Sequence, residues 1–478
     1  MKLLEGKTGL YTDYYEFTMA QGYYLAGKAS VPACFDYFFR SNPYNGGYVI
    51  FAGLDDLLTA IEHFTFDASD VEYFASLGLD AEFLKFLKSF RFRGTITSVR
   101  EGEVVFPLEP VVRVQGTIIE AQLIETILLN LLNFESLIAT KASRLRQAAG
   151  QKRIVDFGLR RAQGLGGVHA SRAAVIGGVD ATSNVSAAQA YGLEVSGTQA
   201  HSWIQSFGSE LAAFRKFAEV FPDRSYLLVD TYDTLRSGVP NAITVAKELE
   251  RSGTKLLGIR LDSGDLAYLS KHARAMLDRA GLTDVKIVAS NQLDEYVIRS
   301  LLEQGAPIDA FGVGTRLVTG QESASLDGVY KLSEFDGQPK LKFSENFTKI
   351  TLPGVKAVQR YADEDAMFYA DGIGLAHETV VSLIHHPMFP EARSNVRARP
   401  AEQLMRTVME QGKRLRQASV EEAAAYARIR LTKLYPEHKR FENPHVYKVG
   451  ISDQLLKMRT QLVEVFFADH ERTNPESA

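Results

Sequence analysis

The sequence predicts an α/β protein whose central part is a closed or nearly closed barrel of parallel strands. Between residues 153 and 313, short runs of β-branched and apolar residues alternate with helix-length segments. This pattern is typical of parallel strands joined by crossover helices. It contains seven strand candidates, and that number favours a barrel over an open sheet. Polar and charged residues gather directly after these strands, at the ends where barrel enzymes carry their sites.

The composition is that of an ordinary globular protein and limits the choice of partners. The 478 residues are 45% hydrophobic and 23% charged, so the chain can bury a large core and is long enough for a barrel with a second domain. The formal net charge is -4, so we expect neither nucleic acid nor a membrane as a partner. The single cysteine, Cys34, fits the reducing cytoplasm. We expect no signal peptide, because Glu5 and Lys7 interrupt the short apolar start.

The first 139 residues are predicted to form a mixed α/β domain. Thr12 and Asp13 precede a helical pattern that contains Tyr14 and Tyr15 and runs to Leu25. The later candidates are a strand at 34–39, helices at 54–63 and 67–77, and β-structure over 92–114. A long amphipathic helix over 120–149 then marks the predicted domain boundary.

The barrel domain is predicted over residues 140–325. Its strand candidates are 153–157, 178–181, 194–197, 226–229, 256–259, 285–290 and 310–313. Its helix candidates include 210–220, 242–251, 267–280 and 295–303. Because the carboxyl ends of parallel strands meet at one end of a barrel, we expect the polar residues that follow them to line a single pocket.

The strongest candidate site lies at 258–266. An apolar strand ends there in Arg260, Asp262, Ser263 and Asp265. Helical periodicity resumes at Leu266, which predicts Asp262 as the N-cap residue and puts Asp265 in the first turn. A cap needs no cation, so Arg260 indicates a charged ligand that carries hydroxyl groups, or a bound metal ion.

Three other strand ends allow both a structural and a functional interpretation. His201 follows a strand, a glycine and a threonine, so it is either a structural histidine or a catalytic one. Asp230 and Asp233 either cap a helix or bind a metal or substrate hydroxyls, and capping is favoured for Asp233. The loop at 311–320 either makes a tight turn or offers backbone amides to a phosphate.

The remainder, 326–478, is predicted to return to the N-terminal domain. Short strands are expected over 326–360, and helices over 400–411 and 420–434. We assign this region a supporting role.

Seven separated segments together resemble, in the usual order, the sequence motifs of the nicotinate phosphoribosyltransferase family. They are 11–24, 156–163, 197–202, 229–233, 258–266, 289–292 and 312–319. The resemblance covers residues 8–360 and implies a type II phosphoribosyltransferase fold, an irregular α/β barrel beside an α/β domain. It also implies a homodimer with sites near the subunit interface, where Tyr14 or Tyr15 of the partner subunit completes the pocket.

The resemblance implies a reaction as well. Nicotinate and phosphoribosyl pyrophosphate would give nicotinate mononucleotide and pyrophosphate, the first step of NAD biosynthesis from nicotinate, with Mg2+ and coupled to ATP hydrolysis. His201 matches the histidine that this family phosphorylates from ATP, and Asp262 and Asp265 would face the ribose hydroxyls or Mg2+. The residues implied to hold nicotinate are Tyr15, Thr198 and Arg260. Those implied to hold the phosphates of phosphoribosyl pyrophosphate are Arg160, Ser290, Asn291, Gly312, Gly314 and Thr315.

Two other functions remain open from the sequence. A nicotinamide phosphoribosyltransferase would differ only in whether the pocket meets an amide or a carboxylate. A non-catalytic barrel would bind a phosphosugar and act on a partner protein. Product formation from the two substrates distinguishes all three.

Overall fold

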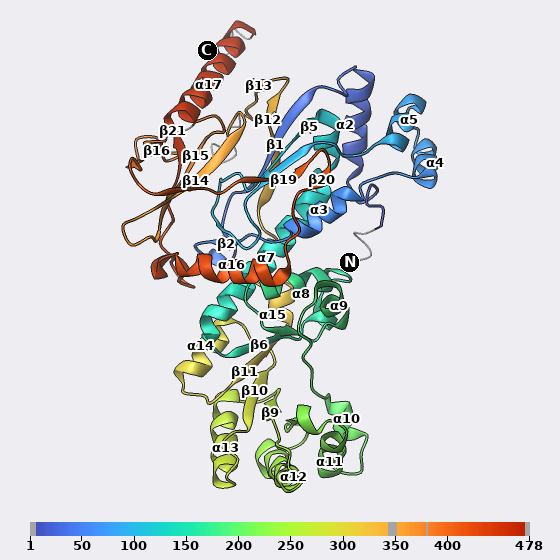
Figure 1. Cartoon of the computed structure of the whole chain (residues 1–478), viewed down its shortest axis with the longest axis vertical. Coiled ribbons are helices and arrows are strands. Elements are labelled where there is room, and N and C mark those ends of the chain that lie inside the picture. Colours follow the sequence, from blue (N-terminus) through green and yellow to red (C-terminus); the bar gives the residue numbers. More distant parts are fainter. Residues whose placement is uncertain (1–5, 343–350, 379–380, 474–478) are drawn as a thin grey trace. The chain divides into compact units, whose positions relative to one another are not determined.

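The structure is a computed structural model that describes residues 6–342, 351–378 and 381–473. The chain forms two compact units. The first unit contains Met1–Leu137 and Ser325–Ala478, and the second contains Ile138–Ala324 (Figure 1). The second unit is thus inserted into the sequence of the first, and the α/β fold expected from the sequence is confirmed.

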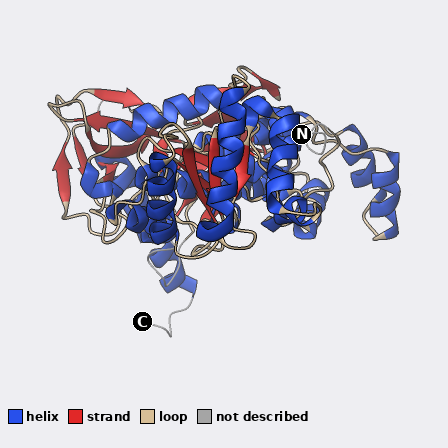
Figure 2. Cartoon of the chain, turned by 90° about the horizontal axis from the view of Figure 1, so that it is seen from below, coloured by secondary structure: helices blue, strands red, loops and turns tan. Residues whose placement is uncertain are grey.

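The described strands of the first unit form two sheets and one short pair. Figure 2 distinguishes the strands, in red, from the helices, in blue. One sheet has the order β13-β12-β1-β5-β3-β19-β20, and its neighbours are antiparallel. Its strands are β1 (Pro32–Phe39), β3 (Thr95–Ser98), β5 (Val112–Thr117), β12 (Gly328–Phe335), β13 (Gln338–Pro339), β19 (Arg406–Glu410) and β20 (Lys413–Arg414). The second sheet and the pair contain β14 (Lys356–Ala362), β15 (Phe368–Leu375), β16 (Leu383–His385), β17 (Arg393–Asn395), β18 (Ala401–Gln403), β21 (Val449–Ser452), β2 (Val49–Ile50) and β4 (Val104–Val105).

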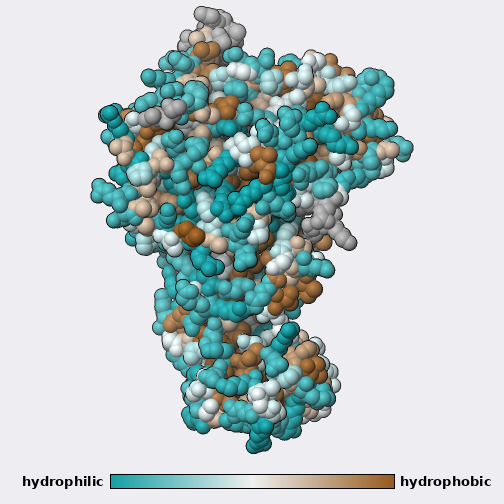
Figure 3. Space-filling model, viewed as in Figure 1, coloured by the Kyte–Doolittle hydropathy of each residue, from teal (hydrophilic) through white to brown (hydrophobic). Residues whose placement is uncertain are grey.

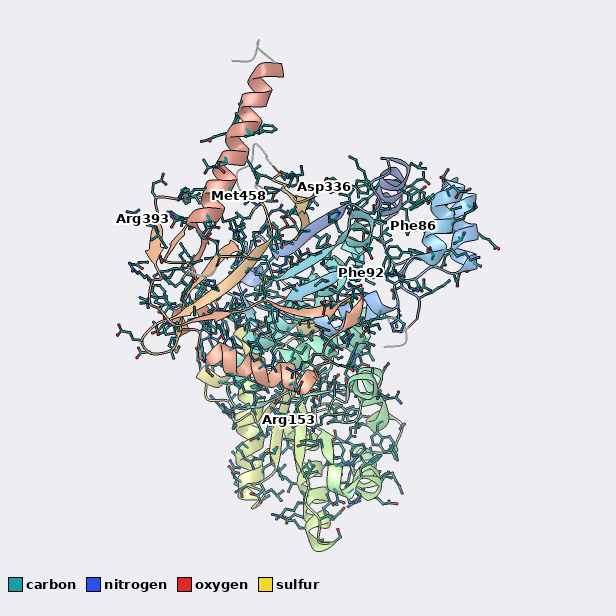
Figure 4. The ribbon with its side chains drawn as sticks, turned by 45° about the horizontal axis from the view of Figure 1, so that its top comes forward. Phe86, Phe92, Arg153, Asp336, Arg393 and Met458 are labelled. Atoms are coloured by element: carbon teal, nitrogen blue, oxygen red, sulfur yellow. The ribbon has the colours of Figure 1, made fainter. Side chains whose placement is uncertain are left out.

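The core of the first unit is rich in aromatic side chains. Phe17 packs on Phe74, with ring centroids 4.2 Å apart, and Phe66 and Phe90 continue the cluster. Phe86, labelled in Figure 4, borders this core on α5 (Ala81–Ser89). The helices of the unit are α2 (Tyr14–Leu25), α3 (Leu54–Glu62), α4 (Ala68–Ser76), α5 (Ala81–Ser89), α6 (Ile118–Leu123), α16 (Val420–Thr432) and α17 (Asp453–Thr473), with 3-10 turns at Pro43–Asn45 and Pro436–Lys439.

The outer surface shown in Figure 3 is mostly hydrophilic, with scattered hydrophobic residues. Within the first unit, α17 extends beyond the strands on which it begins (Figure 1) and exposes Val465, Phe466 and Phe467. By length and composition, the stretch Ile118–Ala149 is the one described helical segment that would suffice to cross a membrane. However, 67% of its most apolar window is buried inside the protein, as in the core helix of a globular fold.

The second unit is built on one parallel sheet. Its order is β7-β6-β11-β10-β9-β8, and the bounds are β6 (Arg153–Asp156), β7 (Ala181–Thr182), β8 (Tyr226–Leu228), β9 (Gly258–Leu261), β10 (Lys286–Ser290) and β11 (Ala310–Val313). An isolated parallel bridge, Thr182↔Val195, extends the sheet beyond β7. The strands therefore follow one another in chain order around a barrel, and among the described residues no backbone ladder joins the Val195 edge to β8.

Helices alternate with these strands as the sequence predicts. Two of them, α11 (Glu210–Val220) and α14 (Glu295–Glu303), have the expected bounds. The others are α8 (Gly166–Ile176), α9 (Val185–Tyr191), α10 (His201–Gln205), α12 (Val239–Arg251), α13 (Leu266–Arg279) and α15 (Thr315–Val318). A π-helical turn, Thr234–Gly238, precedes α12, and the side chain of Asp233 caps it, as predicted.

Some local predictions are wrong. The expected helix at 400–411 is instead two strands, β18 and β19. The backbone φ angles of Gln411 and Gly412 are both positive, which is the geometry of a two-residue hairpin turn, and β19 pairs with β3 on one side and β20 on the other. Pairing with strands far away in the sequence therefore outweighs the local helical pattern.

Two further differences concern helix ends. The predicted helix 120–149 is interrupted at Ile124, so α6 is followed by α7 (Glu125–Ala149), and Thr117 begins α6 with a capping box. The N-cap of α13 is Asp265 and not Asp262, because Gly264, with a φ of 77°, turns the chain between them. Asp262 therefore does not cap α13, and its carboxylate is available for contacts with other residues.

Candidate active site

The carboxyl ends of the parallel strands in the second unit surround a cavity of about 380 Å³. Five of the residues predicted for the site line it: Arg160, Thr198, His201, Arg260 and Asp262. They come from segments separated by up to a hundred residues. A parallel sheet brings them together because all its strands end on the same side.

Arg260 is the central cation of this cavity. It is the third residue of β9, and its side chain is only 12% exposed. Its guanidinium group donates three hydrogen bonds, from Nε to Ser290 (2.9 Å), from one terminal nitrogen to Thr198 (3.1 Å) and from the other to Asp262 (2.8 Å). Since a guanidinium group has five N–H donors, one remains on each terminal nitrogen.

Asp262 joins the ends of β8, β9 and β10. Its Oδ1 atom accepts hydrogen bonds from Arg260 and from the hydroxyl group of Ser290. Its backbone N–H donates to Asp230 Oδ2 at 2.9 Å, and the Ser263 hydroxyl donates to the same oxygen at 2.5 Å. The other carboxylate oxygen of Asp230 is buried and has no recorded hydrogen-bond partner.

His201 lies at the first position of α10 with its two ring nitrogens in different environments. Nδ1 shares a hydrogen bond of 3.1 Å with the Thr231 hydroxyl group, and Nε2 is 3.8 Å from Asp262 Oδ2. The side chain is 42% exposed, so the ring is open to a solute. A hydroxyl group on one nitrogen and a carboxylate near the other can fix the tautomer and the orientation of the ring.

The phosphate-binding candidates lie at the ends of β10 and β11. Ser290 and Gly312 are paired in the sheet, and Gly314 and Thr315 continue from β11 into α15. Asn291 follows Ser290 with a φ of 86°, and the next residue also has a positive φ. Such a backbone conformation is uncommon outside glycine and is concentrated at functional sites.

Seven of the twelve predicted site residues do not line the cavity, namely the phosphate-binding candidates Ser290, Asn291, Gly312, Gly314 and Thr315, together with Asp265 and Tyr15. Asp265 is exposed, and its Oδ1 atom accepts the backbone N–H of Tyr268 at the start of α13. Tyr15 belongs to the first unit, where it is 47% exposed on α2. Partial burial and the nearby carboxylates of Glu125 and Glu16 raise the pKa of Tyr15, so its phenol stays protonated and can donate a hydrogen bond.

Sequence reasoning missed two residues that shape the cavity. Phe157 lines it, and the guanidinium carbon of Arg260 is 5.1 Å from the centre of its ring. A Cβ atom at Gly312 would lie 2.4 Å from that ring, so only glycine leaves room for Phe157 there. Gln199 also lines the cavity and is only 7% exposed. An aromatic residue directly after a strand was the available signal for Phe157, while nothing local marks Gln199.

Asp156 supports the loop that carries Phe157. It is completely buried at the end of β6, and its carboxylate accepts hydrogen bonds from Ser171 (2.7 Å), Thr182 (2.8 Å) and the backbone N–H of Gly158 (2.8 Å). Burial raises the pKa of Asp156, and the three donors oppose this by stabilising the charged form. The network ties the end of β6 to α8 and β7.

Solved structures with a similar fold define the class of protein. The crystal structure of human nicotinic acid phosphoribosyltransferase superimposes with a TM-score of 0.85 at 34% sequence identity, covering 95% of this chain and all of that one. A nicotinate-nucleotide pyrophosphorylase from Pyrococcus furiosus, at 24% identity and a TM-score of 0.70, shares the fold. Fold and site together identify the chain as a type II phosphoribosyltransferase.

Sequence comparison narrows the class to one family. The model of the nicotinate phosphoribosyltransferase family matches residues 152–372, and the models of the N-terminal and C-terminal domains of nicotinate phosphoribosyltransferase match 10–133 and 355–459. The nicotinate phosphoribosyltransferase of Bacillus subtilis is 41% identical over 467 residues, which is 95% of each chain. The chain belongs to the nicotinate phosphoribosyltransferase family.

Proposed function

We propose that this protein transfers the 5-phosphoribosyl group from phosphoribosyl pyrophosphate to nicotinate and couples the reaction to ATP hydrolysis. The products are nicotinate mononucleotide and pyrophosphate. The observation that carries the proposal is the convergence of Arg260, Asp262, Thr198 and His201 on one cavity of about 380 Å³. A cavity of this volume accommodates a small aromatic acid beside part of a phosphosugar.

Nicotinate binds through its carboxylate and its ring. The two free donors of Arg260, one on each terminal nitrogen, match the two oxygens of a carboxylate. Phe157 offers an aromatic surface next to this guanidinium group, on which a pyridine ring can stack. Thr198, already bonded to Arg260, holds the guanidinium group in place.

Phosphoribosyl pyrophosphate binds at the neighbouring strand ends. Displacement of pyrophosphate builds positive charge at the anomeric carbon and negative charge on the leaving group, so carboxylates are needed near the ribose and donors near the phosphates. Asp262 is the carboxylate nearest to Arg260 and serves the ribose side. The proposed phosphate-binding residues are Arg160, Ser290, Asn291, Gly312, Gly314 and Thr315.

Mg2+ fits the carboxylate oxygens in this region. Asp230 has a buried oxygen without a recorded partner, and Asp262 Oδ2 has only His201 nearby among the described contacts. Oxygen ligands of this kind suit Mg2+, which neutralises phosphate charge when bound. Asp262 and Asp265 remain the proposed ligands from the resemblance, and the buried oxygen of Asp230 favours metal binding over capping for that residue.

His201 accepts the γ-phosphate of ATP. A ring nitrogen attacks the phosphorus atom, the bond to ADP breaks, and water later hydrolyses the phosphohistidine, so ATP hydrolysis is coupled to phosphoribosyl transfer. The phosphate adds negative charge beside the site and can shift the equilibrium between open and closed forms.

The proposal includes a homodimer in the cytoplasm. Tyr11, Tyr14 and Tyr15 expose about half of their surface around the start of α2, which suits a protein–protein contact. The partner subunit's Tyr15 is proposed to complete the nicotinate pocket. The single cysteine is buried and unpaired, in keeping with a reducing compartment.

One assay tests the proposal. Purified protein is incubated with phosphoribosyl pyrophosphate, Mg2+ and labelled nicotinate or labelled nicotinamide at equal concentration, with and without ATP. We expect the mononucleotide from nicotinate and a higher rate with ATP. Preference for nicotinamide would contradict the proposal that Arg260 binds the carboxylate of nicotinate. The absence of product from either substrate would favour the non-catalytic, phosphosugar-binding alternative.

A further inference from the structure

The loop between Val195 and α10 crosses the open seam of the barrel. On one side, Val195 forms the last bridge beyond β7, and on the other, β8 is the terminal strand of the sheet. In the part of the second unit that the structure describes, no strand pairing joins these edges. Residues 197–200 have no regular secondary structure, so no strand pairing holds them in place.

Gln199 makes the contact that spans the seam. Its Nε2 atom donates a hydrogen bond of 3.0 Å to the backbone carbonyl of Tyr226, the first residue of β8. Gln199 is only 7% exposed, although the segment around it lies at the mouth of the cavity. The side chain thus replaces a missing strand neighbour and satisfies a carbonyl at the sheet edge.

The residues around Gln199 are proposed to bind and react. Thr198 accepts a hydrogen bond from Arg260, and His201 shares one with Thr231. Segment 198–201 is therefore attached to the ends of β8 and β9 by Thr198 and His201, and to the start of β8 by Gln199. Of these three attachments, only that of Gln199 involves none of the proposed substrate-binding or reacting groups.

We propose that Gln199 is a positioning residue for the nicotinate and ATP steps. Its amide fixes segment 198–201 against β8, which presents Thr198 to Arg260 and His201 to Asp262. The proposal rests on the function proposed above for Thr198 and His201. Without the amide donor the Tyr226 carbonyl loses its partner, the seam loosens and both residues are less well positioned.

Two substitutions separate the hydrogen bond from the shape of the side chain. Gln199→Met keeps the length and removes the donor. Gln199→Glu keeps the shape, and the introduced carboxyl group donates to Tyr226 only when it is protonated, a state that burial favours by raising its pKa. Gln205→Met and Gln205→Glu are the matched controls, because Gln205 is exposed on α10 and does not line the cavity.

The first readout is the Kd of nicotinate, measured by calorimetry on the full chain at about pH 8 and about pH 6, each relative to the unsubstituted protein. We expect Gln199→Met to weaken binding roughly three- to tenfold at both pH values. Gln199→Glu should weaken it similarly at the higher pH and recover at the lower one. The pH-dependent recovery tests the donor even if Gln199→Met does not fold.

The second readout is the rate at which [γ-32P]ATP labels His201, for which we expect the same order of variants. The positioning role is overturned if Gln199→Glu is equally impaired at both pH values. It is also overturned if the Gln199 variants behave like the Gln205 controls. If the unsubstituted protein neither binds nicotinate nor takes up phosphate, the proposed function itself fails. The two failures are thus distinguishable.

Discussion

Arg260 combines a structural role and a binding role in one side chain near the end of β9. It donates to Thr198, Asp262 and Ser290, and it keeps one donor on each terminal nitrogen for a ligand. The three internal bonds hold the guanidinium plane before any substrate arrives. Preorganisation of this kind reduces the entropy that binding must overcome.

Replacing Arg260 by alanine removes the proposed carboxylate contact. We expect the KM for nicotinate to rise about 10- to 150-fold, corresponding to about 1.5–3 kcal/mol for charge-assisted hydrogen bonds. Initial rates at varied nicotinate concentration measure this. Arg215→Ala is the control, because Arg215 is exposed and bonds only to Glu248 among its recorded partners. A nearly unchanged KM would mean that the carboxylate binds elsewhere.

Replacing His201 by alanine removes the proposed phosphate acceptor. We expect the stimulation by ATP to disappear while a basal rate of phosphoribosyl transfer remains, since Arg260 and Asp262 are retained. The measurement is the rate with and without ATP at fixed Mg2+. His272→Ala serves as the control, because His272 lies exposed on α13 and its Nδ1 atom contacts only the Tyr268 carbonyl among its recorded hydrogen bonds. Persistent stimulation by ATP in His201→Ala would remove the phosphohistidine from the mechanism.

At the scale of the elements, buried carboxylates join neighbouring helices and strands in both units. Asp156 ties β6 to α8 and β7 in the second unit. In the first unit, Gln122 of α6 donates to Glu16 of α2 at 2.8 Å and to Glu125 of α7 at 3.0 Å. Each carboxylate is buried among fixed donors, so its charge and the packing of its element are coupled.

Asp156→Asn should destabilise the second unit. Asparagine has one acceptor oxygen where aspartate has two. Its amide N–H group would face a hydrogen-bond donor that now donates to the carboxylate. We expect a loss of about 1–3 kcal/mol in the free energy of unfolding, measured by urea titration. Asp284→Asn is the control, since Asp284 is exposed and pairs with Lys255 at the surface. Equal stability of the two variants would show that the network contributes little.

Glu16 makes the stability of the first unit depend on pH. Burial raises its pKa from the usual 4.5 to about 7. A carboxyl group with a raised pKa in the folded state stabilises the fold fully below the unfolded value, and this contribution is lost as the pH rises through the folded value. We therefore expect the free energy of unfolding to fall by about 2 kcal/mol between about pH 5 and about pH 8 because of this group.

The test compares the pH profile of unfolding in the unsubstituted protein and in Glu16→Gln. The neutral amide cannot titrate and can still accept from Gln122, so the drop due to Glu16 should be absent. Glu82→Gln, at an exposed position on α5, is the control. Parallel profiles for the unsubstituted protein and Glu16→Gln would refute the assignment.

At the scale of the whole molecule, we propose that two chains share each site. Arg260 belongs to the second unit, and the exposed Tyr15 belongs to the first. In a symmetric dimer, residues from two different subunits can meet at each interface site. Mixtures of two variants can therefore test whether the site is shared.

We expect a mixture of Arg260→Ala and Tyr15→Ala, refolded or exchanged at equal amounts, to regain activity at low nicotinate concentration. Half of the dimers would then be mixed, and one of their two sites would be intact, so about a quarter of the sites should recover. The measured quantity is the rate at limiting nicotinate relative to each variant alone. A rate equal to the average of the two variants would contradict a shared site.

The sequence by itself determined the elements whose signals are local. The alternation of strands and helices from 153 to 313, the polar residues at the strand ends and the cap at Asp233 all follow from periodicity and from side-chain chemistry within a few residues. The gathering of Arg260, Asp262, Thr198 and His201 follows too, because parallel strands must end on one side of their sheet.

Only the tertiary structure decided the rest. It turned 406–410 into a strand on β3, joined Asp262 to Ser290, placed Phe157 next to Gly312, and attached Gln199 to Tyr226 across the barrel seam. Each of these depends on a partner far away in the chain. Local propensity amounts to a few tenths of a kcal/mol per residue, and a long-range strand pairing or buried hydrogen bond outweighs it once the fold brings the partners together.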